Sequence, residues 1–85
     1  WADAIEADAD HLAALEVADT GKPVTVARDG EVPFAVDNLR FFAGAARSLD
    51  GTGAGTLSEG YTSIITRRPV GLVAGITPWN FPLIM

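Results

Sequence analysis

The sequence predicts an α/β fold, because helical and strand patterns occupy successive parts of the chain. Apolar residues recur at helical spacing through the first half. A segment of alternating, β-branched residues follows at 61–68, and a continuous apolar run occupies 70–76. A short apolar run bounded by turn residues is typical of a strand that is covered on both faces, as in a parallel sheet. We therefore expect helices first, then an exposed strand, then a buried one.

Residues 1–19 are predicted to form one amphipathic helix. Its apolar stripe recurs at spacings of four and three, at Ile5, Ala9, Leu12 and Leu15. Gly21 and Pro23 follow directly and predict the end of the helix, since Gly favours the position after a helix and Pro cannot continue it. His11 is alone on this helix. We interpret it as a surface residue rather than a metal ligand or proton shuttle, because no second ligand lies near it.

A short helical turn is predicted at residues 24–29, and the residues 29–31 (Asp-Gly-Glu) should break it. Pro33 then opens a second long helix that runs to about Arg47. The apolar positions of this helix are Val32, Phe34, Val36, Leu39, Phe41, Phe42, Ala43 and Ala46. Its phenylalanines fit either a ligand wall or core packing between the two helices, and we favour core packing. Arg40 and Arg47 are expected to be solvated or paired with acids on their own helix.

Residues 48–60 are rich in glycine and contain three alternate glycines. A phosphate-binding loop is a poor fit, since no strand precedes them and no lysine follows. We favour a loop that changes direction between a helical layer and a sheet. Residues 61–68 are predicted to form an exposed strand, because both of its faces are half polar. Arg67 and Arg68 fit an anion site and protection of a strand edge equally well.

The apolar run at 70–76 ends in the sequence Thr77-Pro78-Trp79-Asn80. Pro78 keeps Thr77 out of helical geometry. Asn80 is a good helix N-cap, and Pro82 is tolerated in the first turn of a helix. Strand, tight loop and helix start is the arrangement by which α/β folds hold ligands at the carboxyl ends of strands.

Asn80 is the strongest candidate for chemistry in this chain. A side-chain amide at a constrained turn can donate an N–H to an oxygen that becomes anionic during a reaction. The competing interpretation is a helix cap, worth about 1 kcal/mol. From the residues alone we favour the cap, although the two roles are compatible because the amide oxygen caps while the nitrogen donates.

Composition excludes several classes of protein. The 85 residues are enough for one small domain, and 48% hydrophobic and 20% charged residues argue against general disorder. The net charge of -5 argues against a nucleic-acid partner. The sequence contains no cysteine, hence no disulfide framework, and no spacing typical of a metal site. Without an apolar span or a signal peptide, no membrane attachment is expected and the cytoplasm is the default location.

The sequence of residues 78–82, Pro-Trp-Asn-Phe-Pro, preceded by Arg-Pro-Val-Gly-Leu-Val at 68–73, resembles that of aldehyde dehydrogenases. Leu15-Glu16, residues 19–23 (Asp-Thr-Gly-Lys-Pro) and residues 37–44 (Asp-Asn-Leu-Arg-Phe-Phe-Ala-Gly) are similar to the N-terminal helices of that family. The resemblance covers nearly the whole chain but only the early part of the family's longer chain. The start at Trp1, the stop at Met85 and an apolar strand without a partner likewise lead us to expect a fragment.

The resemblance implies a division of the chain into three parts. Residues 1–60 would be the N-terminal helical part of the cofactor-binding domain. Residues 61–69 would be a β arm that pairs with neighbouring subunits in a dimer or tetramer. Residues 70–85 would be the first strand and nucleotide-site loop of a Rossmann-like cofactor domain, which is incomplete in this fragment.

The resemblance also implies a chemistry, the NAD- or NADP-dependent oxidation of an aldehyde to a carboxylic acid. A cysteine thiolate would add to the aldehyde, Asn80 would hold the oxyanion, hydride would pass to the nicotinamide, and a glutamate would activate water to hydrolyse the thioester. Main chain at Ile76, Thr77, Pro78 and Trp79 would contact the cofactor. The cysteine is absent from these 85 residues, and the glutamate would lie beyond them, so the chain alone should be inactive.

The rival hypothesis is a small non-enzymatic α+β module. Such a protein would bind partners by adding a strand to its exposed strand. A module should fold cooperatively by itself, whereas a fragment should expose its apolar strand and aggregate.

Overall fold

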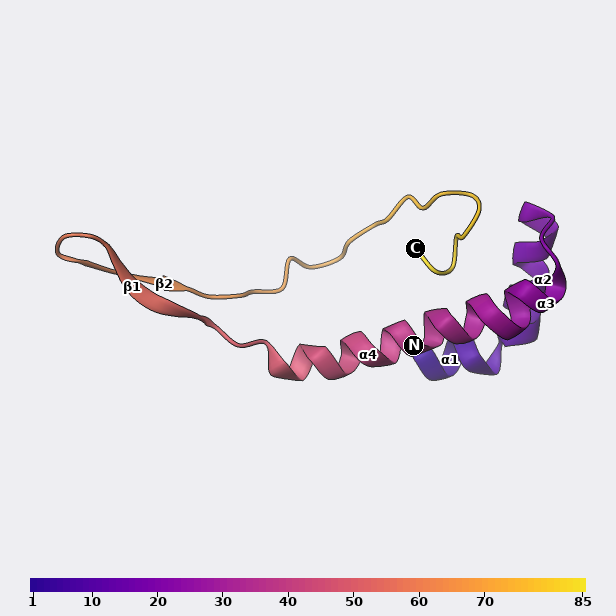
Figure 1. Cartoon of the computed structure of the whole chain (residues 1–85), viewed down its shortest axis with the longest axis horizontal. Coiled ribbons are helices and arrows are strands. Elements are labelled where there is room, and N and C mark those ends of the chain that lie inside the picture. The colour runs from indigo at the N-terminus through magenta and orange to yellow at the C-terminus, as the bar shows by residue number, and fades with distance from the viewer.

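The protein is elongated, with a helical layer at one end and a two-stranded antiparallel sheet at the other (Figure 1). The computed structural model describes the backbone of residues 1–85 and every side chain except that of residue 52. The chain measures 61 × 23 × 19 Å, and its radius of gyration is 19.2 Å. A compact domain of this length has a radius of gyration of about 12 Å. The sheet therefore protrudes from the helices as an arm.

The first predicted helix is in fact two helices, α1 (Ala2–Ala7) and α2 (Ala9–Thr20). Asp8 separates them with φ −107° and ψ 20°, outside helical geometry. Asp is a weak helix former because its side chain competes with the backbone for hydrogen bonds. The break lets α1 lie along α4 while α2 runs in another direction (Figure 1).

The predicted end of α2 is confirmed. Gly21 adopts the left-handed conformation, with φ 73°, and its N–H donates to the Val17 carbonyl at 2.9 Å. This bond satisfies one of the carbonyls that a helix end leaves without an intrahelical partner.

A continuous helical path follows Pro23. It consists of α3 (Val24–Val26), a π-helical segment (Ala27–Glu31), α4 (Val32–Ala45) and a 3₁₀ turn (Ala46–Ser48). The predicted short turn and the second long helix are confirmed. The predicted break at 29–31 is wrong, because the wider π turn carries the chain through Gly30 into α4. Glycine in a helix costs only about 1 kcal/mol, and the burial of Val32 and Val36 next to it offsets this.

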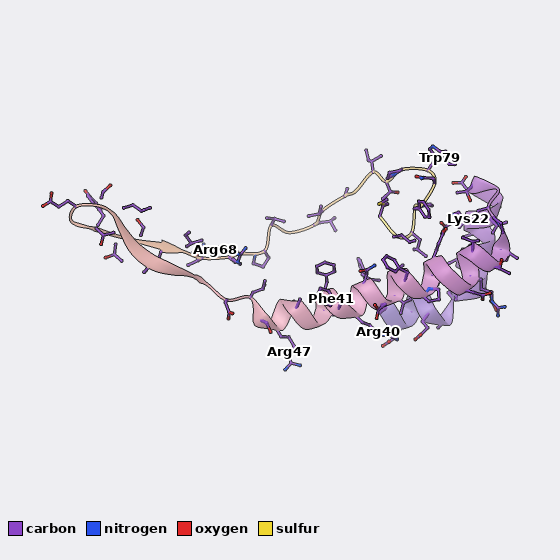
Figure 2. The ribbon with its side chains drawn as sticks, in the orientation of Figure 1. Lys22, Arg40, Phe41, Arg47, Arg68 and Trp79 are labelled. Carbon is purple, nitrogen blue, oxygen red and sulfur yellow. The ribbon has the colours of Figure 1, made fainter. Side chains whose placement is uncertain are left out.

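The hydrophobic core is small and lies where α2, the π-helical segment and the first turns of α4 meet. Its buried residues are Ala13, Ala27, Val32 and Val36, and the partly buried residues against them include Ile5, Ala9, Val17 and Leu83. Core packing of the phenylalanines is wrong in this structure, since Phe34, Phe41 and Phe42 are each more than half exposed. Phe41 lies on the part of α4 that extends beyond α1 (Figure 2). No helix covers it there.

Arg40 of α4 and Arg47 of the 3₁₀ turn after it were expected to be solvated or to pair within their own helix. Arg47 is exposed, but Arg40 bridges to α1. Its Nη2 donates to Asp3 Oδ1 at 2.8 Å and to Glu6 Oε2 at 2.6 Å. The hydrogen bonds and the positive charge of Arg40 lower the pKa of Asp3 and that of Glu6.

The arm is a hairpin of β1 (Thr52–Ser58) and β2 (Tyr61–Ile65). The exposed strand predicted at 61–68 is confirmed over Tyr61–Ile65. The loop predicted at 48–60 is wrong over Thr52–Ser58, because this glycine-rich segment pairs with β2. The pairing satisfies backbone groups and so overrides the low strand propensity of glycine. The register is irregular on both sides of Gly55.

Residues 66–85 return from the arm to the helices without forming a helix or strand of their own. The buried strand predicted at 70–76 is wrong in this structure, where Leu72 and Ile76 are fully exposed. A strand needs a neighbour for its ladder, and none of the described elements lies beside this segment in the sheet. The helix predicted after Asn80 is reduced to a turn, in which the Met85 N–H donates to the Phe81 carbonyl at 3.2 Å.

Candidate functional site

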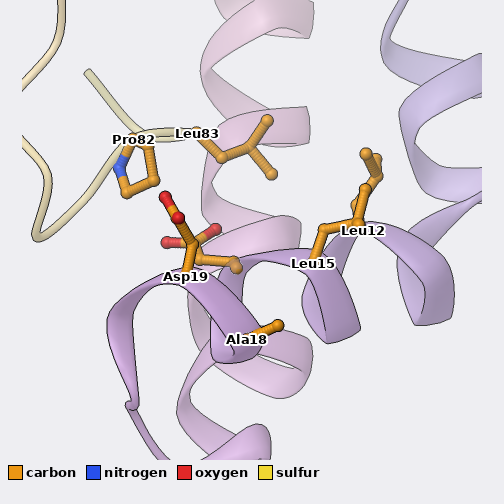
Figure 3. A pocket seen from close by; sticks show the side chains of 7 residues that line it. Leu12, Leu15, Ala18, Asp19, Pro82 and Leu83 are labelled. Carbon is orange, nitrogen blue, oxygen red and sulfur yellow. The ribbon is translucent and has the colours of Figure 1, made fainter.

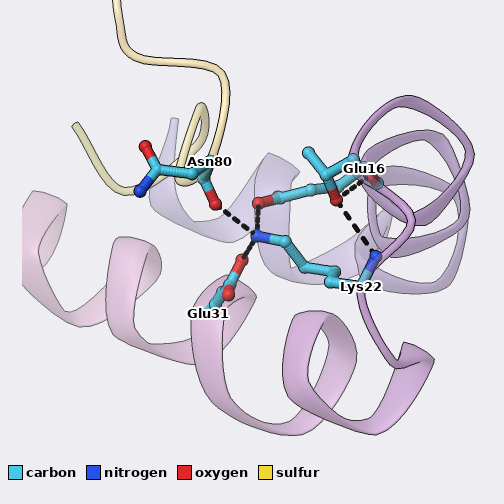
Figure 4. Close-up of polar contacts among 5 residues, drawn as sticks. Glu16, Lys22, Glu31 and Asn80 are labelled. Carbon is cyan, nitrogen blue, oxygen red and sulfur yellow. Dashed lines mark hydrogen bonds and ion pairs between the residues drawn. The ribbon is translucent and has the colours of Figure 1, made fainter.

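The candidate site lies where the chain returns to the helical layer, and it is organised by Lys22. The end of α2 holds this residue in place. The Thr20 hydroxyl donates to the Glu16 carbonyl at 2.7 Å and accepts the Lys22 N–H at 3.4 Å. Together with the left-handed Gly21, these bonds direct the Lys22 side chain back across the helix end (Figure 4).

The Lys22 ammonium has three partners (Figure 4). It donates to Glu16 Oε1 at 2.6 Å, to Glu31 Oε2, and to the main-chain carbonyl of Asn80 at 2.9 Å. An ammonium carries three N–H donors, so this arrangement gives each of them one acceptor. We call these four residues the Lys22 cluster.

The three charged side chains of the Lys22 cluster are shielded from solvent. The side chains of Glu16, Glu31 and Lys22 are 4%, 5% and 12% exposed. Buried charges persist in proteins when they are paired and hydrogen-bonded. Within the described residues, Glu31 Oε1 is a buried oxygen that has no hydrogen-bond partner.

Burial and pairing act against each other on the ionisation of the cluster. Burial and the adjacent Glu31 raise the pKa of Glu16. For Glu31, burial favours a higher pKa, but the interactions with the adjacent Glu16 and with the Lys22 ammonium outweigh it and lower the pKa. For Lys22, burial favours a lower pKa, but its bonds to both glutamates outweigh it and raise the pKa. The cluster therefore retains a charged ammonium.

Asn80, the predicted catalytic residue, is brought into this cluster by its backbone and not by its side chain. The main-chain carbonyl faces Lys22, while the side-chain amide points away from it (Figure 4). Next to it, the Phe81 ring lies 4.9 Å from the Lys22 ammonium, in cation–π geometry. The side chain of Asn80 is thus exposed on a backbone that is fixed to the helical layer.

The predicted cofactor-contacting residues Ile76, Thr77, Pro78 and Trp79 are all exposed. Trp79 lies at the outer bend of the returning segment (Figure 2). The structure brings none of the four against the helices, and only their neighbour Asn80 is fixed there. Their main chain is accessible to a ligand.

An open apolar groove borders the Lys22 cluster on the α2 side (Figure 3). Pro82 and Leu83 of the returning segment form one wall. The face of α2 forms the rest, with Leu12, Leu15, Glu16, Ala18 and Asp19. Glu16 belongs to both the groove and the cluster. Leu83 also packs partly against the core, so the turn after Asn80 is attached to the helices by apolar as well as polar contacts.

The other candidates from the sequence lie outside this site. His11 is exposed and contacts Asp8 at 3.1 Å, which confirms it as a surface residue. Arg67 and Arg68 are exposed on the segment that follows the arm. Among the described residues, no group of His, Asp and Glu side chains could hold a metal ion.

The Lys22 cluster was not predicted from the sequence, although the sequence places two carboxylates on buried helix faces. Glu16 follows Leu12 by four residues, so it lies on the apolar stripe of its helix, and Glu31 precedes the buried Ala35 by four. A carboxylate on a buried stripe requires a cation to pair with. Lys22 is the single lysine in the sequence, so it was the lysine that could pair with Glu16 and Glu31.

The whole chain, residues 1–85, matches the model of the aldehyde dehydrogenase family. Similar proteins include a fluoroacetaldehyde dehydrogenase of Streptantibioticus cattleyicolor, 43% identical over 99% of this chain and 16% of its own length. The NADP/NAD-dependent aldehyde dehydrogenase PuuC of Escherichia coli is 43% identical over 99% of this chain and 17% of its own. A probable aldehyde dehydrogenase of Streptomyces coelicolor is 39% identical over 99% of this chain and 16% of its own.

This chain therefore spans about one sixth of the length of these relatives. None of the helices in the described structure is both long and apolar enough to cross a bilayer. The match extends over all of the elements described above, from α1 to the turn that carries Asn80. The chain belongs to the aldehyde dehydrogenase family.

Proposed function

We propose that residues 1–85 act as the N-terminal segment of an NAD- or NADP-dependent aldehyde dehydrogenase, which oxidises an aldehyde to a carboxylic acid. A thiolate from another part of the enzyme adds to the carbonyl carbon and forms a thiohemiacetal. Loss of hydride gives a thioester, and water hydrolyses it to the acid and frees the thiolate. NAD or NADP, when bound, supplies the hydride acceptor. The 85 residues alone hold no cysteine, so by themselves they are inactive.

Asn80 is the residue of this segment that acts on the reacting atoms. Its side-chain amide donates an N–H to the oxyanion that forms when the thiolate adds. One observation carries this assignment: its carbonyl is fixed at 2.9 Å from Lys22 while its side-chain amide points away into the open. A fixed backbone limits the positions that the amide can reach, and a donor placed before the reaction stabilises developing charge. Residues 79–84 form turns and no helix begins at Asn80, which supports the donor role over a helix cap.

Residues 76–79 form the contact with the cofactor in this proposal. Their main chain is exposed directly before Asn80, so a nicotinamide that lies along them comes close to the aldehyde carbon. The name of one relative, the NADP/NAD-dependent PuuC, supports either nucleotide. Completion of the cofactor domain turns residues 70–76 into the first strand of a Rossmann-like sheet, with residues 1–60 as the helical part before it.

The arm serves oligomerisation in this proposal. Residues 61–69 and the β1 strand form a hairpin that extends away from the helices, with exposed Leu57, Ile64 and Ile65. Free edges and apolar side chains of this kind favour strand pairing with a second subunit. The expected assembly is a dimer or tetramer.

The substitution Asn80→Ala in the full-length enzyme tests this function. We expect kcat to fall by about 10²- to 10³-fold, as for removal of one oxyanion donor, with a much smaller change in KM. Steady-state rates with a panel of aliphatic and aromatic aldehydes, and with NAD and NADP, measure both constants.

Asn38→Ala is the matched control, because it removes the same amide from a half-buried position on α4. It should leave kcat near the wild-type value. A folded Asn80→Ala enzyme that turns over at the wild-type rate would remove Asn80 from the chemistry.

A further inference from the structure

The bond between Lys22 and Asn80 joins two parts of the chain that lie 58 positions apart. Between them the chain runs along α4, out along the arm and back. The returning segment contributes few other fixed points, since residues 66–79 are exposed throughout. The position of the Asn80 backbone relative to the helices therefore depends on Lys22 and on the partial burial of residues 82–84 that follow it.

Two buried carboxylates fix the Lys22 ammonium in turn. Glu16 belongs to α2 and Glu31 ends the π-helical segment, so the two acids come from elements that pack on each other. With two of its N–H donors held by these acids, the third points in one direction, toward the Asn80 carbonyl. An ammonium with tetrahedral donors suits this arrangement, whereas the planar fork of a guanidinium does not.

We propose that Lys22 is a positioning residue of the active site. By holding the main-chain carbonyl of Asn80, it sets the place from which the Asn80 amide donates to the oxyanion. This inference rests on the proposed role of Asn80. It assigns a function to the Lys22 cluster that goes beyond the stability of the helical layer.

Lys22→Met in the full-length enzyme tests this inference, because it keeps the aliphatic stem and removes all three donors. We expect kcat to fall about 10- to 100-fold, since misplacement of a reacting group by about 1 Å can cost 10²-fold. KM should change little, because the amide acts mainly in the transition state. Lys22→Arg keeps the charge, so compared with Lys22→Met it should restore stability more fully than it restores kcat.

Two further variants separate positioning from general loss of structure. Lys22→Met combined with Glu16→Gln and Glu31→Gln removes the unpaired acids, so it should fold and still show the low kcat. Arg40→Met is the matched control, since Arg40 also bridges two carboxylates but lies away from Asn80. It should leave kcat unchanged. Circular dichroism and thermal unfolding identify folded variants.

The Asn80→Ala background gives the decisive comparison. There, Lys22→Met should cause no further loss of kcat, since the amide that it positions is gone. If the two losses multiply, or if a folded Lys22→Met variant keeps the wild-type kcat while Asn80→Ala does not, the positioning role is overturned and the proposed function stands. If Asn80→Ala itself leaves kcat unchanged, the proposed function fails and the role of Lys22 fails with it.

Discussion

Gly21 determines where the Lys22 side chain begins. Its φ of 73° lies in the left-handed region that side chains with a Cβ rarely adopt. This conformation ends α2 and turns the next residue back toward Glu16. Apart from Gly21 itself and its two neighbours in the chain, no residue has an atom within 4 Å of the place that a Cβ on Gly21 would occupy. The requirement for glycine is therefore conformational and not a matter of space.

Gly21→Ala should lower the free energy of unfolding by about 1 kcal/mol, the cost of placing alanine in the left-handed region. Gly44→Ala is the matched control, because Gly44 lies in α4 with equally open space around it. It should raise stability by up to about 1 kcal/mol, since alanine favours a helix. Urea unfolding of the full-length protein measures both. Equal stabilities of the two variants would contradict the argument.

Asn80 and Lys22 differ in how far the sequence could predict them. Asn80 became a candidate because a side-chain amide at a constrained turn can donate to an oxyanion, and the resemblance to aldehyde dehydrogenases favoured this role over a helix cap. Lys22 was missed as a site residue because its partners Glu16 and Glu31 meet it only after α2 and the π-helical segment pack together. Local sequence patterns indicate a residue at a constrained turn such as Asn80. They give only hints of contacts such as those of Lys22, which form when distant elements pack together.

At the scale of elements, α1 and α4 are held together by two exposed ion pairs and a small number of apolar contacts. Arg40 reaches both acids of α1, and Ile5 packs partly against the core. Exposed ion pairs of this kind stabilise proteins only weakly and are screened by salt. Because the partners of Arg40 are carboxylates that can be protonated, the stability that these ion pairs add should depend on pH.

The pKa of Asp3 and of Glu6 is lower in the folded protein than the ordinary values of 3.8 and 4.5. Their contribution to stability is therefore complete above these ordinary values and is lost as pH falls through the lowered, folded-state values. We expect wild type to be more stable than Arg40→Met at pH 6, with the difference shrinking as pH falls below the ordinary pKa values of these two carboxyls. Thermal unfolding across this range measures it. A constant difference would contradict the role of these carboxylates.

The helices were predictable because their periodicity, caps and end signals are local. Pro23, Gly21 and Pro33 mark boundaries that the structure confirms. The strand β1 was not predictable in this way, because its glycines acquire strand structure only by pairing with β2. The break at Asp8 depends likewise on the packing of α1 against α4.

At the scale of the whole molecule, the helical layer and the arm form two ends of a long body (Figure 1). Exposed apolar side chains lie on the arm and on residues 70–76. Both sets of residues remain open to pairing with further strands, from the same enzyme or from a neighbouring subunit. The sequence predicted an exposed arm strand, while burial of residues 70–76 requires strands beyond those described.

Ile64→Asp in β2 should reduce the oligomeric state of the full-length enzyme without unfolding it. Ile64 is exposed on the arm, so the new charge would be buried only at a subunit contact. Val24→Asp is the control, because it makes a similar change at an exposed position of α3. Light scattering coupled to size exclusion measures the mass. An unchanged mass for Ile64→Asp would argue against the arm as an interface.

The contact between Lys22 and Asn80 joins the chain before α4 to the chain after the arm. Because the two ends of the segment between residues 22 and 80 are held together, a change in the length of the hairpin does not change the geometry of the turn at residue 80. In the proposed assembly, insertions and deletions near Gly60 would therefore alter how the arm pairs with a second subunit and would leave the turn at residue 80 in place. If Asn80 acts as proposed, its chemistry would then be independent of the length of the arm, so that assembly and catalysis would change separately.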